Sequence, residues 1–102
     1  MSHLVQLLLP ALDNEGAAFP HAEFERVARE LTERFGGVTA FTRVPAEGRW
    51  KQGGKTEHDE ILVVEVMDDT LDRAFWKNYR AELEARFRQD VVIIRAQEIE
   101  LL

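Results

Sequence analysis

Apolar residues are arranged along the chain in four strand-like runs, and the two most informative runs meet at a glycine pair. The first run covers residues 3–9, the second begins near Val38, the third ends near Met67 and the fourth begins at Val91. Gly53-Gly54 separates the second and third runs, and glycine adopts the positive φ angles of tight hairpin turns without steric cost. The sequence therefore predicts a long β-hairpin.

Two helical patterns separate the strand-like runs. Apolar residues recur three and four apart at Phe24, Val27, Ala28, Leu31 and Phe35, and again at Leu71, Phe75, Tyr79, Leu83 and Phe87. Pro20 suits the first turn of the first helix, and Gly36-Gly37 ends it. For the second helix we expect a cap at Asp69 or Thr70, with Asp72 in the first turn.

The resulting order, βαββαβ, predicts an α+β fold of the ferredoxin-like kind. In this fold a four-stranded antiparallel sheet, in the strand order four, one, three, two, carries both helices on one face. The length of 102 residues suits one domain spanning 1–102.

The second face of this sheet is expected to be apolar as well. Leu4, Leu8, Ile61, Val63, Met67, Val91 and Ile93 all fall on it. If Gly53-Gly54 forms the turn, Thr42 lies opposite Glu65, and one polar side chain per strand crosses this face: Arg95, Gln6, Glu65 and Thr42. The row is either a structural network at an interface or a ligand-contacting or catalytic site.

An apolar face of this size predicts self-association, as a dimer or a trimer. We expect Val63 and Met67 to lie in the interface. Trp50, near the hairpin tip, is expected to pack on a partner subunit, with ligand contact or packing within its own chain as alternatives. Trp76, beside the apolar stripe of the second helix, is expected to be half-buried.

Charge and composition exclude several classes of partner. The net charge of −6 argues against a nucleic-acid partner, which requires clustered cations. No helix has the basic amphipathic face of a membrane-binding segment, and the apolar run at Leu4–Leu9 is too short for a signal peptide. The absence of cysteine excludes disulfides and thiol chemistry and favours the cytoplasm.

Motifs for metal or cofactor chemistry are missing. Glu57–Glu60 gathers four ionisable residues, but strand alternation divides them between two faces, so we interpret this stretch as a solvated hairpin stem. His3 and His21 are isolated and are expected on the surface. With no phosphate-binding or nucleophile motif present, we expect neither a metal nor a cofactor.

One stretch carries a family resemblance. Gly36-Gly37-Val38-Thr39, then Glu47-Gly48-Arg49-Trp50, then Glu57 resemble an uncharacterised family of small bacterial proteins, a domain of unknown function. The resemblance covers roughly residues 20–67 and implies the ferredoxin-like fold but no activity. We expect the chain to lack the export signal that is associated with many of those proteins.

Two functions remain open from the sequence. The first is a self-associating domain that binds a small ligand on the open sheet face or between subunits. The alternative is a cofactor-independent enzyme of the dimeric α+β barrel kind, which would act on a small apolar or aromatic substrate. In that enzyme Glu65, Arg95 or a histidine would move protons.

Overall fold

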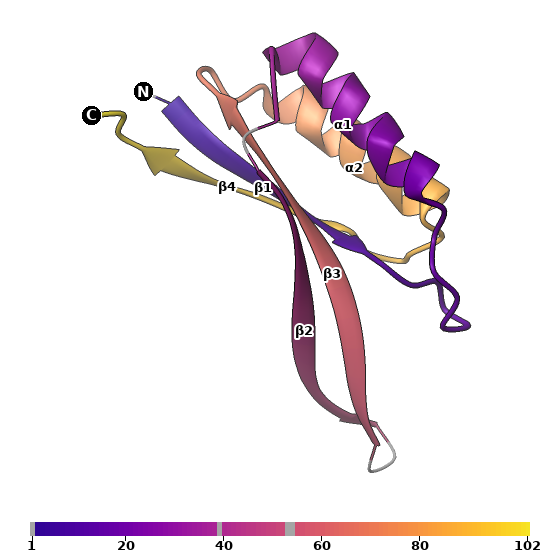
Figure 1. The fold of residues 1–102 in the computed structure, drawn as a ribbon. Helices are drawn as coiled ribbons and strands as arrows, with labels where there is room; N and C mark the ends of the chain where they lie inside the picture. The colour runs from indigo at the N-terminus through magenta and orange to yellow at the C-terminus, as the bar shows by residue number, and fades with distance from the viewer. Residues whose placement is uncertain (1, 39, 53–54) are drawn as a thin grey trace.

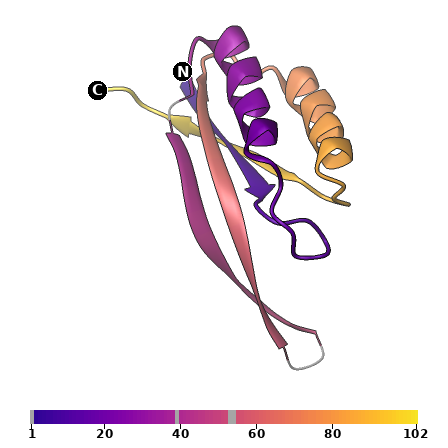
Figure 2. The same ribbon diagram turned by 45° about the vertical axis from the view of Figure 1, so that its right-hand side comes forward.

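The computed structural model describes the backbone of residues 2–38, 40–52 and 55–102, and their side chains outside residues 40–60. Six elements follow one another: β1 (Ser2–Pro10), α1 (His21–Phe35), β2 (Ala40–Gln52), β3 (Lys55–Asp68), α2 (Arg73–Arg86) and β4 (Ile93–Ile99). Both helices lie on one side of the sheet, and the β2–β3 hairpin projects beyond them (Figures 1 and 2). The predicted α+β class is confirmed.

The sheet departs from the predicted arrangement in its width. Its strand order is β2-β3-β1-β4, and all neighbours are antiparallel. Within the described residues, the four strands lie side by side only at the levels of Val63, Val64 and Glu65 on β3. The predicted ferredoxin-like four-stranded sheet with both helices on one face is corrected accordingly, because its four strands pair together over only a short stretch. Over most of β1 the sheet has three strands, and the far part of the hairpin has two.

Two local features explain why the sheet narrows. β1 ends at Pro10, which has no backbone N–H to extend a ladder, so the hairpin continues without a third strand. β4 begins at Ile93 rather than at Val91 as predicted. The backbone N–H of Val92 donates to Glu84 Oε2 on α2, at 3.0 Å, and this bond takes the chain toward the helix before the strand begins.

The hairpin register also differs from the prediction. Thr42 lies opposite Val63, and Ala40 lies opposite Glu65. The register shifts by two residues between Glu47 and Lys51, where Gly48 lies, and glycine is common at such irregularities. Because the shift is an even number, it leaves the alternation of the two faces unchanged. The Gly53-Gly54 turn lies outside the described residues.

The core fills the space between the sheet and the helices. Its fully buried members include Val5, Leu7, Leu9, Val64 and Val66 from the sheet and Val27, Leu31, Leu83 and Phe87 from or beside the helices. The helix-facing alternation predicted for β1 and β3 is therefore confirmed. Trp76, expected to be half-buried, is a core residue with 6% of its surface exposed.

The helix ends show one agreement and one correction. Gly36 ends α1 at a φ of 84°, which glycine adopts without strain, and its N–H donates to the Thr32 carbonyl at 2.8 Å. The cap of α2 is Asp72, whose Oδ1 accepts from the Phe75 N–H at 3.1 Å, and not Asp69 or Thr70. Neither helix in the described part of the chain has the length and apolar composition needed to cross a membrane.

Arg86 ties the two helices together. Its guanidinium makes two hydrogen bonds to the Glu30 carboxylate, at 2.5 and 2.7 Å, and the Tyr79 hydroxyl donates to the same carboxylate at 3.1 Å. The bonds from Arg86 lower the pKa of Glu30, whereas burial and the nearby Glu30 charge raise the pKa of Tyr79. This clamp fixes the helix pair above the sheet.

Asp68, at the end of β3, fixes the start of α2. Its side chain is buried and accepts the Trp76 indole N–H at 3.0 Å. It also accepts the backbone N–H groups of Thr70 and Asp72, at 3.3 and 3.4 Å. One carboxylate thus satisfies three donors at the strand-to-helix connection, where Leu71 has a φ of 44°.

We predict that Asp68→Ala lowers the free energy of unfolding by about 3 kcal/mol, because it leaves buried donors without an acceptor. Urea denaturation at neutral pH measures this loss. Asp69→Ala is the matched control and should cost less than about 1 kcal/mol, since within the described residues Asp69 accepts only an exposed hydrogen bond from Ser2. Equal losses for the two variants would contradict the role of Asp68.

Candidate functional site

Three polar side chains lie side by side on the open face, which is the sheet face away from the helices. The strand pairing places Gln6 between Glu65 and Arg95. Gln6 Nε2 donates to Glu65 Oε2 at 3.3 Å, and Arg95 Nε donates to Gln6 Oε1 at 2.8 Å. We call these three residues the polar row. Its central amide links a carboxylate on β3 to a guanidinium on β4.

Apolar side chains surround the polar row. Leu4, Leu8, Ile61 and Val63 are half-buried. Met67 and Ile93 are more open, with 38% and 52% of their surfaces exposed. A contiguous surface of this kind is typical of a site that contacts another molecule. Val91, also expected here, lies before the start of β4 and is 70% exposed.

The structure brings together three of the four residues predicted to form a row. Thr42 is displaced from it, because the hairpin register places Ala40 beside Glu65. The side chains of Thr42 and Trp50 lie outside the part of the structure that is described, so the predicted role of Trp50 stays a prediction. The interface role of Val63 and Met67 also stays a prediction.

Several hydrogen-bonding groups of the polar row have no partner within the described residues. Among the described residues, neither terminal nitrogen of Arg95 and neither lone-pair site of Glu65 Oε1 has a partner. Gln6 and Glu65 are half-buried, whereas Arg95 is exposed. The row thus offers donors at one end and an acceptor at the other, and it can contact a ligand that carries both a negative and a positive group.

Histidines and carboxylates do not form a metal centre in the described part of the chain, where no three such side chains converge. The Glu57–Glu60 side chains lie outside that part. His21 is exposed as expected, but the surface interpretation is wrong for His3, whose side chain is only 18% exposed. The His3 imidazole lies 3.9 Å from the Glu98 carboxylate on β4.

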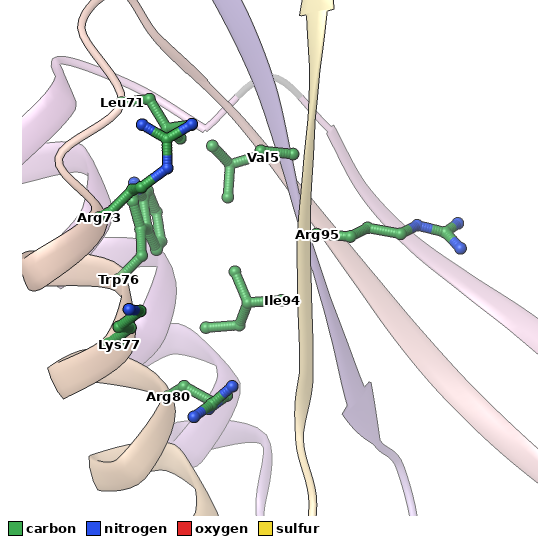
Figure 3. Close-up of a pocket in the computed structure, with 9 residues that line it drawn as sticks. Val5, Leu71, Arg73, Trp76, Lys77, Arg80, Ile94 and Arg95 are labelled. Atoms are coloured by element: carbon green, nitrogen blue, oxygen red, sulfur yellow. The ribbon is translucent and has the colours of Figure 1, made fainter.

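A cavity of about 260 Å³ lies on the other side of the sheet, between α2 and β4. Figure 3 shows Arg73, Lys77 and Arg80 on α2 facing Val5 and Ile94 on the sheet, while Arg95 points away to the opposite face. The sequence analysis missed this cavity. The spacing of the three cations along one helix face was the available signal, but exposed helices commonly carry such cations.

Comparisons with known proteins identify a structural relative. One solved structure, a phage SAM lyase in complex with S-methyl-5'-thioadenosine, superposes with a TM-score of 0.66 over 95% of this chain and 81% of that chain. The two sequences are 14% identical, so the likeness concerns the fold. No protein-family model matches the chain, and no curated protein matches it.

Proposed function

We propose that the protein is a small self-associating domain whose open face binds a small organic ligand through the polar row. The observation that carries this proposal is the polar row itself. A carboxylate and a guanidinium lie within an apolar surface, and both keep hydrogen-bonding capacity that no described residue uses. Binding sites for small molecules combine apolar walls with a few polar groups in this way.

The apolar sheet face that the helices leave uncovered supports self-association. An antiparallel sheet with helices on one face is normally polar on the other, yet this open face carries Leu4, Leu8, Val63 and Ile93. A second copy presents the same apolar surface, and contact between the two copies removes both surfaces from water. The opposite charges at the two ends of the polar row also suit contact between copies, since Arg95 of one copy can pair with Glu65 of another.

The ligand class follows from the unused groups of the row. Arg95 is suited to a carboxylate or phosphate, because a guanidinium donates in a planar fork. Glu65 is suited to a cationic or hydrogen-bond-donating group. The fold neighbour binds a thioadenosine, which makes S-adenosylmethionine and S-methyl-5'-thioadenosine suitable first probes. The amino acid part of S-adenosylmethionine carries both charges that the row complements.

An enzyme acting on such a ligand is the second candidate. Glu65 Oε1, without a partner in the described residues, would accept a proton from a bound substrate. The fold neighbour is a lyase, which supports this candidate at the level of fold. Mass spectrometry of S-adenosylmethionine incubated with the protein would separate the candidates, since only an enzyme consumes it in a manner that Glu65→Gln abolishes.

We predict that light scattering gives a solution mass of two or three chains, and that Val63→Asp reduces it to one. A buried carboxylate on the open face must lose its hydration on association. Ala22→Asp places the same charge on an exposed position of α1 and should leave the multimer intact. A wild-type monomer, or equal dissociation of both variants, would contradict self-association through this face.

For the ligand, we predict that isothermal titration detects S-adenosylmethionine binding that Arg95→Gln weakens about tenfold, the loss expected for one charged hydrogen bond. Arg29→Gln removes the same charge from exposed α1 and should bind as the wild type does. Light scattering on each variant separates a lost contact from a lost multimer. Binding that is unchanged in Arg95→Gln would rule out the polar row as its site.

A further inference from the structure

The cavity between α2 and β4 gathers positive charge that has no partner within the described residues. Arg73, Lys77 and Arg80 follow one another at intervals of four and three residues, which places them on one face of α2. None of the three forms a hydrogen bond or an ion pair in the described part of the chain. The neighbouring arginines differ, since Arg34 pairs with Asp72 and Arg86 with Glu30.

This charge is unusual for the chain as a whole. The formal net charge is −6, so the average surface repels anions. Three cations along about two turns of one helix, none paired with a described residue, create a local positive field against that background. Such a field attracts an anion to this place.

The floor of the cavity is apolar. Ile94 on the sheet and Leu71 beside α2 are half-buried and supply its accessible apolar surface, whereas the lining residues Val5 and Trp76 belong to the buried core. Figure 3 shows Val5 and Ile94 pointing toward the helix side chains. A fully hydrated inorganic anion would leave this floor in contact with water, whereas an apolar body attached to the anionic group would cover it.

We propose that this cavity is a second binding site, for a small organic anion that combines a phosphate or carboxylate with a flat apolar body. The anionic group lies among Arg73, Lys77 and Arg80, and the body lies on the half-buried side chains of Ile94 and Leu71. The volume of about 260 Å³ suits a molecule the size of a substituted benzene ring. The site does not depend on the polar row, because Arg95 directs its side chain to the opposite face of the sheet.

The test is an NMR titration of the ¹⁵N-labelled full chain with phenyl phosphate. We expect saturable chemical-shift changes for the Trp76 indole N–H and the backbone amides of Ile94 and Ala96. The resonances of the Gln6 side-chain amide, which report on the open face, should not shift. Inorganic phosphate and benzyl alcohol, which each supply half of the proposed chemistry, should bind at least about tenfold more weakly.

Variants then test the cations directly. The double variant Lys77→Gln/Arg80→Gln should weaken phenyl phosphate binding about tenfold, at roughly threefold per exposed cation. Arg29→Gln, on exposed α1, should bind as the wild type does. Three results would overturn the proposal. They are no binding of phenyl phosphate, equal binding by the wild type and the double variant, and binding of benzyl alcohol as tight as that of phenyl phosphate. Because the substituted residues are exposed, the amide spectrum of each variant confirms that it folds.

Discussion

The structure depends on one constraint: both faces of the central strands are apolar, but both helices cover the same face. Val5, Leu7 and Leu9 of β1 are buried beneath the helices. Leu4, which precedes Val5, and Leu8, which lies between Leu7 and Leu9, point to the open face and are half-buried. Because side chains alternate at every residue of a strand, no change of helix position can cover both sets. This constraint is the physical basis of the proposed self-association.

The apolar surroundings of the polar row determine how it can contribute to binding. A carboxylate under an apolar cover loses its hydration and must be compensated, and the Gln6 amide gives Glu65 only part of that compensation. Arg95 has donors left for the remainder. A ligand or a second copy that completes these bonds would be favoured over one that only covers the apolar side chains, so the row can provide specificity while the surrounding leucines and valines supply the free energy of association.

Much of the fold was predictable because strand alternation and helix periodicity are local. The faces of β1 and β3 were assigned correctly even though the hairpin register was wrong, since a shift of two residues preserves alternation. Neither the irregularity near Gly48 nor the positive φ of Leu71 has a sequence signature strong enough to predict it. The first moved Thr42 away from the row, and the second placed the α2 cap at Asp72.

The width of the sheet and the cavity between α2 and β4 could not be predicted from the sequence, because both depend on how separate elements pack together. The Val92 N–H donates to Glu84 of α2, eight residues earlier, and neither helix periodicity nor strand alternation indicates this bond. The three cations of α2 gain significance only when β4 is known to lie opposite them. The polar row was predictable because Gln6, Glu65 and Arg95 lie on strands whose pairing follows from the fold.

The most direct test of the covered open face is hydroxyl-radical footprinting of Met67 over a range of protein concentrations. Met67 is 38% exposed in a single chain and lies next to the polar row, and methionine is readily oxidised. If copies associate through this face, the rate of Met67 oxidation falls as concentration rises, while oxidation of Leu101, 65% exposed on the tail beyond β4, does not change. A Met67 rate that is independent of concentration would contradict the account.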